Sequence, residues 1–315
     1  ARQYSNDTVL FNKAKQEAQF AFENVHSDLG KSIFDVSMLP EYGIFYNGWE
    51  KYLLGKMIQA DIVKDTISIA LFKQNCATMA DVFLSSPTPF LDSYPGMSWP
   101  SDATVAIAAL SLHDRVFEPL YDSCIQDWLS KIKVLLDTNT LLMPHMTISG
   151  TGQLAQGSRG SSMSLMLIFL SEINPVFAQQ QFELYQQHFS HTILGLPAIR
   201  EYPEGVKGSG DIDSGPVIFG MSFSGTIVSV GTFNKFGANN QADKLNACIE
   251  SFGFPLSGKN EKKFAFGKFP VADAFILWTK LQSPEPYFES RNEDVNFGNT
   301  LWFHLVSMLI FIWLI

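Results

Sequence analysis

Apolar residues recur along most of this chain at the spacing of helices rather than strands. In the segment 6–28, Phe11, Ala14, Ala18 and Phe22 fall on one side of a helix, three or four residues apart. The strict alternation of apolar and polar residues that marks a half-buried strand is scarce. We therefore predict an all-α fold.

The remaining expected helices are of two alternating types. The first type is rich in small and apolar residues, and its members start near Tyr46, Ser101, Ser158, Ser214 and Val271. The second type is amphipathic, and its members span 62–83, 115–136, 175–190 and 239–252. Because the first type recurs at intervals of roughly 56 residues, we expect an internal repeat of helical hairpins.

The helices near 101–112, 158–171 and 214–230 are apolar on all sides, which predicts that they are buried on all sides. An inner layer of buried helices and an outer amphipathic layer together make an α/α toroid, which we expect over residues 1–282. Its inner helices would start at one end and form a pocket there. The alternatives are an open α-solenoid and a polytopic membrane protein. The runs 103–112 and 163–170 are too short to span a bilayer, which disfavours the latter.

The last part of the chain is apolar and uncharged. From Leu301 to Ile315 only His304 and Ser307 are not apolar, and the uncharged stretch begins at Val295. About 20 such residues span a bilayer. We predict a linker at 283–299, rich in Pro, Glu and Asn, and a membrane anchor at 300–315 that is cut short inside a longer segment. The alternative is a buried C-terminal helix. The anchor would make the protein membrane-associated, on a side that flanking charges do not indicate.

Composition narrows the classes of function. The formal net charge is −9 with 22 Lys and Arg residues, and no basic cluster exceeds Lys262-Lys263, so a nucleic-acid partner is not expected. Cys76, Cys124 and Cys248 lack the spacing of metal ligands, and we expect them to pack in the core. Nucleotide-binding and metallopeptidase fingerprints are missing from the sequence. We predict neither a cofactor nor a metal site.

Carboxylates stand immediately before two of the inner helices. Asp102 follows Pro100-Ser101, where it is either a first-turn acid that favours the helix dipole or a general acid or base. Asp211 and Asp213 stand before Ser214-Gly215-Pro216 at the start of the longest apolar run. Since one cap satisfies one helix, we predict a pocket role for at least one of these two carboxylates.

The same segments hold the expected substrate-binding residues. Arg159 lies among Gly and Ser, where it would bind an anionic group or pair with Asp102 or Asp213. Glu201 either lines the pocket or pairs with other loop groups. Aromatic walls with a few polar groups suit a sugar or an isoprenoid. The remaining lining candidates are Tyr46, Asn47, Trp49, Trp99 and Tyr202.

The order of several sequence blocks resembles the linalool dehydratase/isomerase family. The blocks are Ile44-Phe45-Tyr46-Asn47-Gly48, Asp102-Ala103-Thr104-Val105-Ala106 ending at His113-Asp114-Arg115, Ser162-Met163-Ser164 through Ile173-Asn174-Pro175-Val176-Phe177-Ala178, Tyr185 to Phe189, and Asp211-Ile212-Asp213-Ser214-Gly215. The resemblance covers about residues 43–280. It implies an α/α toroid, a pocket at the starts of the inner helices and homo-oligomer formation. The family's proposed catalytic residues are two cysteines, whose places fall here at Asp102 and near Ser93.

Two functions follow from these observations. The first is an enzyme, a hydrolase, lyase or isomerase, that applies carboxylate acid/base chemistry to a sugar or isoprenoid-like substrate. Its catalytic residues would be Asp102 and Asp213, supported by Asp211. The alternative is a non-catalytic binding or scaffold protein of the cell envelope, tethered to the membrane by the C-terminal segment. In that case the carboxylates at the helix starts are caps only.

Overall fold

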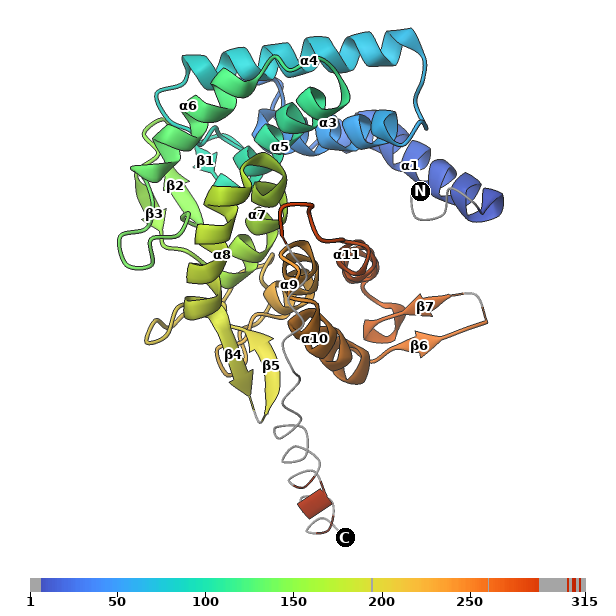
Figure 1. The fold of residues 1–315 in the computed structure, drawn as a ribbon, viewed down its shortest axis with the longest axis vertical. Coiled ribbons are helices and arrows are strands. Elements are labelled where there is room, and N and C mark those ends of the chain that lie inside the picture. The colour runs from blue at the N-terminus through green and yellow to red at the C-terminus, as the bar shows by residue number, and fades with distance from the viewer. Residues whose placement is uncertain are drawn as a thin grey trace. The chain divides into compact units, whose positions relative to one another are not determined.

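The structure is a computed structural model that describes residues 7–193, 195–259 and 261–288, together with 305, 308, 309 and 312. This part of the chain is mostly helical, with eleven α helices and seven strands of two to four residues (Figure 1). Contacts between residues divide it into two compact units. Unit 1 comprises 1–139 and 143–157, and unit 2 comprises 140–142 and 158–315. The predicted helical class is thus confirmed, and the short strands were not predicted.

Unit 1 holds six helices and one small antiparallel sheet. Its helices are α1 (Thr8–His26), α2 (Asp28–Lys31), α3 (Gly43–Gln59), α4 (Thr66–Ser85), α5 (Pro100–Val116) and α6 (Asp122–Lys133). The sheet has the order β1 (Met97–Ser98), β2 (Met146–Ile148) and β3 (Leu154–Gln156). The apolar helices α3 and α5 pack against each other. A Cβ at Gly48 would lie 3.0 Å from the amide nitrogen of Ala106, so this glycine permits the close approach.

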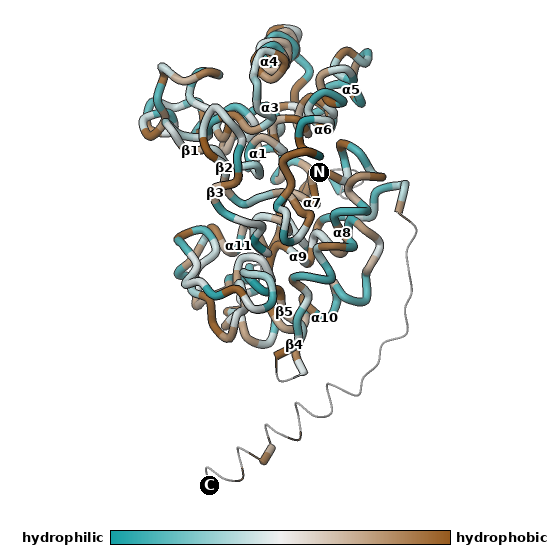
Figure 2. Tube along the Cα trace, turned by 90° about the vertical axis from the view of Figure 1, so that its left-hand side faces the viewer, coloured by the Kyte–Doolittle hydropathy of each residue, from teal (hydrophilic) through white to brown (hydrophobic). Residues whose placement is uncertain are grey.

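Unit 2 holds five helices and two hairpins. Its helices are α7 (Gly160–Ile173), α8 (Pro175–Phe189), α9 (Phe223–Lys235), α10 (Asn239–Phe252) and α11 (Pro270–Lys280). Strands β4 (Ser190–Ile193) and β5 (Leu196–Ile199) form one antiparallel hairpin, and β6 (Leu256–Ser257) and β7 (Lys262–Lys263) form the other. The apolar helix α9 packs against both α7 and α11. Figure 2 shows the contrast between the hydrophobic α7 and the more hydrophilic α10.

The two predicted helix types are visible in each unit. All residues of α5 from Asp102 to His113 are buried, as are most of α7 and α9. The amphipathic helices α4, α8 and α10 bury one side each, against α3, α7 and α9 respectively. Burial on all sides follows from side chains that are apolar on all sides, because exposing them to water is unfavourable.

Two helix starts were predicted wrongly. The amphipathic helix expected over 115–136 begins only at Asp122, as α6. The expected inner helix over 214–230 begins only at Phe223, where Ser222 is the N-cap and its hydroxyl accepts a hydrogen bond from the Gly225 amide. Residues 214–222 form turns instead. Gly215, Phe219 and Gly220 adopt positive φ there, which a helix does not accommodate. The apolar residues of this run are therefore divided between a helix and a loop, in which Ile218 and Phe219 are exposed.

No helix within the described residues is long and apolar enough to cross a membrane. The predicted anchor at 300–315 and most of the predicted linker at 283–299 lie outside the described residues. The described part of that linker, up to Phe288, is tied to α9. Glu285 pairs with Lys235 at 2.5 Å, and the Phe288 ring packs on Phe236 at 4.5 Å between ring centres.

Candidate acid–base site

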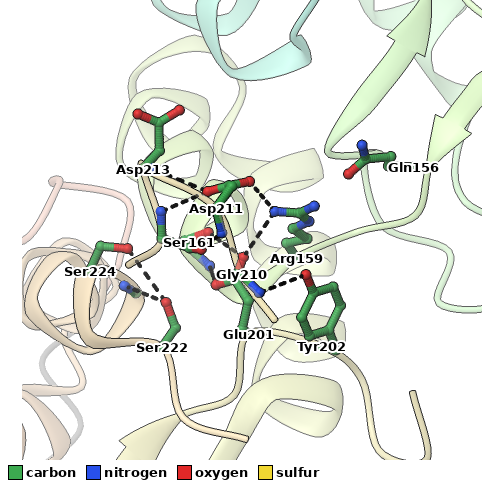
Figure 3. A network of polar contacts seen from close by, with 12 residues as sticks. Gln156, Arg159, Ser161, Glu201, Tyr202, Gly210, Asp211, Asp213, Ser222 and Ser224 are labelled. Carbon is green, nitrogen blue, oxygen red and sulfur yellow. Dashed lines mark hydrogen bonds and ion pairs between the residues drawn. The ribbon is translucent and has the colours of Figure 1, made fainter. Parts of the chain in front are cut away.

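A fully buried carboxylate, Glu201, joins the starts of α7 and α9 in unit 2 (Figure 3). The hydroxyl of Ser161, in the first turn of α7, donates to Glu201 Oε1 at 2.9 Å. Ser222, the N-cap of α9, also hydrogen-bonds to the Glu201 side chain. The starts of these two apolar helices therefore meet at one acidic side chain, within a single unit.

Burial controls the protonation of Glu201. Removing the carboxylate from water raises its pKa, because the charged form loses hydration. Hydrogen bonds from Ser222 and Ser161 and the positive charge of Arg159 work in the opposite direction and offset this effect in part. Glu201 consequently holds its proton to a higher pH than an ordinary glutamate.

Arg159 stands next to Glu201 as the N-cap residue of α7. Its Nη1 atom lies 3.7 Å from Glu201 Oε1 and forms a closer ion pair with Oδ2 of Asp211. The guanidinium lies over the ring of Tyr202, 5.2 Å from the ring centre, which is the geometry of a cation–π contact. Arg159 was predicted to bind an anionic group or to pair with Asp102 or Asp213, and within unit 2 the structure shows it in ion pairs with Asp211 and Glu201.

The loop that carries Asp211 and Asp213 is a hydrogen-bonded turn. Asp211 Oδ1 accepts from the amide of Asp213 at 3.1 Å and from the amide of Ser214 at 2.9 Å. The Ser214 hydroxyl accepts in return from the Asp211 amide at 2.9 Å. Asp211 therefore caps its own turn while it pairs with Arg159, and the Asp213 carboxylate is directed away from Arg159 (Figure 3).

The two aspartates differ in their acidity. Although partial burial favours the neutral form, the hydrogen bonds from Ser214 and the charge of Arg159 hold the pKa of Asp211 below its ordinary value. The pKa of Asp213 is raised, by partial desolvation first and by the negative charge of Asp211 second. Over an intermediate range of pH, Asp211 is therefore ionised while Asp213, two residues away, is protonated.

Close backbone approaches hold this group of residues together. A Cβ at Gly160 would lie 1.9 Å from the carbonyl oxygen of Arg200, and the Gly160 amide donates to the carbonyl of Glu201 at 2.9 Å. A Cβ at Gly208 would lie 2.2 Å from the ring of Tyr202. Only glycine fits at these two positions without displacing the Arg200 carbonyl or the Tyr202 ring.

Asp102 lies in unit 1, in the first turn of α5, and is buried. Its Oδ2 accepts a hydrogen bond of 2.6 Å from the hydroxyl of Ser93. The carbonyl of Asp92, the residue before Ser93, accepts from the amide of Ile44 at the start of α3. The starts of α3 and α5 are thus linked through the loop at 92–93, much as the starts of α7 and α9 are linked through Glu201.

Two of the lining residues predicted in unit 1, Tyr46 and Trp99, belong to an aromatic cluster at the same helix starts. Tyr94 stacks on Phe34 with 5.7 Å between ring centres and meets Trp99 edge-to-face at 5.8 Å. Tyr46 is buried against Phe34, and its hydroxyl donates to the carbonyl of Val25. Trp49 is half-buried. The structure therefore brings Trp99 and Tyr46 into one cluster through Phe34.

Asn47 has a visible structural role. Its side-chain amide donates to the carbonyls of Glu41 and Gly43, and its oxygen accepts from Lys51 at 3.0 Å. These contacts fix the first turns of α3. They use the donors and an acceptor that substrate binding would need.

Ser161 and Ser222 were not among the predicted site residues, although their hydroxyls hold Glu201. A signal for both exists in the sequence, since Ser is common at helix starts, but nothing local connects either serine with Glu201. The predicted site residues are divided between the two units. Asp102, Tyr46, Asn47, Trp49 and Trp99 lie in unit 1, and Arg159, Glu201, Tyr202, Asp211 and Asp213 lie in unit 2.

Within the ranges that the structure describes, no three or more His, Cys, Asp or Glu side chains are arranged to hold a metal ion. Cys76 and Cys124 are buried and unpaired with another cysteine, as expected for core residues, and Cys248 is partly exposed. Compared with known proteins, the chain matches no protein-family model and no curated protein.

Proposed function

We propose that this chain is an enzyme that uses carboxylate general acid/base catalysis on a small hydroxylated molecule, a sugar or an isoprenoid-like alcohol. The observation that carries the proposal is the opposite shift in pKa of Asp211 and Asp213 beside Arg159. Pairs of carboxylates with separated pKa values are the usual basis for distinct acid and base roles in one site.

Asp213 is the general acid in this proposal. Its carboxylate is exposed, so a substrate oxygen can reach it, and its raised pKa keeps it protonated to higher pH. Asp211 stays ionised and is fixed by its own turn and by Arg159, so it stabilises developing positive charge. Glu201 is a positioning residue, because it has no exposed surface and acts through Ser161, Ser222 and Arg159.

Asp102 is proposed as a second acid or base, together with Ser93. The 2.6 Å contact between them supports this role, since it gives a serine hydroxyl a carboxylate acceptor within proton-transfer distance. These are the positions at which the linalool dehydratase/isomerase family, which the sequence resembles, places its cysteines. The chemistry supported here is therefore that of a hydroxyl and a carboxylate rather than that of two thiols.

The α/α toroid also remains a proposal. It is supported by the packing of α3 on α5 and of α9 on α7 and α11, and by the linked helix starts in each unit. Homo-oligomer formation is proposed with it, on the family resemblance alone. Membrane association through the segment 300–315 is proposed on the sequence pattern alone.

The test is a turnover screen. The full chain is incubated with oligosaccharides and terpene alcohols, and products are detected by mass spectrometry. Asp213→Asn should lower the rate by about 10²–10⁴-fold, the usual contribution of a general acid. Asp243→Asn is the matched control, because Asp243 is an exposed aspartate on α10. Full activity of Asp213→Asn on a substrate that the wild type converts would refute the assignment.

A binding or scaffold function is the second candidate. The observations that favour it are the engagement of the Asn47 amide with backbone carbonyls and the capping of its own turn by Asp211. If the wild type converts no member of the panel, and Asp213 titrates at an ordinary aspartate pKa by NMR, this second candidate is preferred.

A further inference from the structure

We infer that the end of α10, the β6–β7 hairpin and the turn before α11 form a docking surface for an anionic lipid bilayer. The surface, called here the hairpin surface, is made of six apolar side chains and the lysines beside them. The apolar residues are Phe252, Phe254, Leu256, Phe266, Phe269 and Val271, which are 50% to 61% exposed. It belongs entirely to unit 2, and the hairpin projects away from α10 and α11 (Figure 1).

The exposed phenyl rings are held in place by the backbone beneath them. Phe254 and Phe266 stack with 4.8 Å between ring centres, and the Phe266 amide donates to the carbonyl of Phe254. The Ala265 amide donates to the carbonyl of Gly253 at 2.8 Å. The chain segments before β6 and after β7 are thus clamped together with both rings at the surface.

Backbone strain is concentrated at the same place. Phe254, Ala265 and Phe266 all adopt the left-handed conformation, with φ of 49°, 48° and 55°. Residues with a Cβ rarely adopt it, and such strain gathers at functional sites where the surrounding structure enforces it. Here the strained backbone directs aromatic side chains outwards, although burying them would be favourable in water.

The charge of this surface is opposite to that of the whole chain. Residues 250–271 contain four lysines and two acidic residues, Glu250 and Glu261, whereas the chain as a whole carries a formal net charge of −9. Lys259 and Lys268 are exposed, and Lys263 pairs with Glu261 at 3.1 Å. Lys262 and Lys280 both pair with Glu250 on α10, which ties the hairpin to α10 and α11.

Aromatic side chains surrounded by lysines fit the interface of a bilayer that contains anionic lipids. The rings enter the boundary between headgroups and acyl chains, while the ammonium groups contact lipid phosphates and carboxylates. An acidic chain without such a surface would be repelled by anionic lipids. This inference is independent of the proposed enzyme activity and of the segment 300–315.

The test places a fluorophore that is sensitive to polarity on the hairpin surface of the full chain. Phe266→Cys is labelled in a Cys248→Ser background, since the other two cysteines are buried. The control label is at Val176→Cys on α8, a position that is also apolar and 55% exposed. Vesicles of phosphatidylcholine, with or without phosphatidylserine, carry spin-labelled lipids as quenchers. The fluorescence reports on the labelled position, whatever other segment binds lipid.

The expected result is a blue shift and quenching at position 266 with phosphatidylserine vesicles, and neither at position 176. Lys259→Gln and Lys268→Gln should each raise, about fivefold, the lipid concentration that gives half of the maximal fluorescence change. Lys133→Gln, on α6, should leave it unchanged. An unaltered label at 266, or equal changes at 266 and 176, would overturn the inference. A blue shift at position 266 that grows with protein concentration in the absence of lipid would also overturn it, because it would indicate that a second copy of the chain covers the hairpin surface.

Discussion

The guanidinium of Arg159 lies over the ring of Tyr202 while it pairs with the carboxylate of Asp211. The Tyr202 hydroxyl in turn accepts a hydrogen bond from the Gly210 amide, directly before Asp211. Arg159 is thus positioned by the ring of Tyr202 and by the turn at Asp211, which the Tyr202 hydroxyl also supports. This arrangement links the start of α7 to the loop at 210–215.

Arg159→Met should lower the free energy of unfolding by about 1–3 kcal/mol, because it leaves the ionised Asp211 without its cation. Urea denaturation measures the change. Tyr202→Phe is the comparison, since it keeps the ring beneath Arg159 and removes only the acceptor for the Gly210 amide. A loss for Arg159→Met no greater than that for Tyr202→Phe would show that the ion pair contributes little.

The free energy of unfolding of Glu201→Gln should increase relative to that of the wild type as the pH rises. The folded wild type binds more protons than the unfolded chain between the ordinary glutamate pKa, about 4.3, and the raised pKa of buried Glu201. Its stability therefore falls with rising pH across that window, and the glutamine variant lacks this fall. Denaturation at several pH values gives the difference. A difference independent of pH would contradict the raised pKa.

The pair of His26 and Glu50 should stabilise unit 1 mainly at low pH. Nε2 of His26 lies 3.2 Å from Oε1 of buried Glu50 on α3, and helix α1, which His26 ends, has no buried residue. The hydrogen bond to Glu50 raises the pKa of His26, against the opposing effect of burial.

This stabilisation is complete below the unfolded histidine pKa of about 6.5 and is lost as the pH rises through the higher folded value. NMR titration of His26 and denaturation of His26→Asn at several pH values test it. The stability difference between His26→Asn and the wild type should shrink towards alkaline pH. A His26 pKa at or below the ordinary histidine value would rule the effect out.

Gly160→Ala should lower the free energy of unfolding by about 1–3 kcal/mol or more. The added methyl group would meet the carbonyl of Arg200 and force α7 away from Glu201. Gly205→Ala is the matched control. It adds a methyl group in open space at a positive φ, and backbone strain alone costs about 1–2 kcal/mol. The two variants should also differ in the pKa of Glu201, measured by NMR, with a shift in Gly160→Ala only.

The helix pattern was predictable because it is local. The predicted helix 239–252 coincides with α10, and the predicted helix 175–190 ends one residue beyond α8. In both cases the apolar spacing along a few turns contains the information that packing later uses. The run 214–222 shows the limit of this reasoning. Its apolar residues suit a helix, but the positive φ angles of Gly215, Phe219 and Gly220 place them in turns.

The sequence by itself determined the helical class, the alternation of buried and amphipathic helices, and the segments in which the acidic and aromatic residues gather. These properties depend on neighbours within one or two turns. Only the tertiary structure decided that Arg159 pairs with Asp211 and that Glu201 is enclosed by serines from α7 and α9. The protonation of a carboxylate depends on burial and on charges brought close by folding. Residues separated by 40 or more positions, such as Ser161 and Glu201, create an environment that no local pattern encodes.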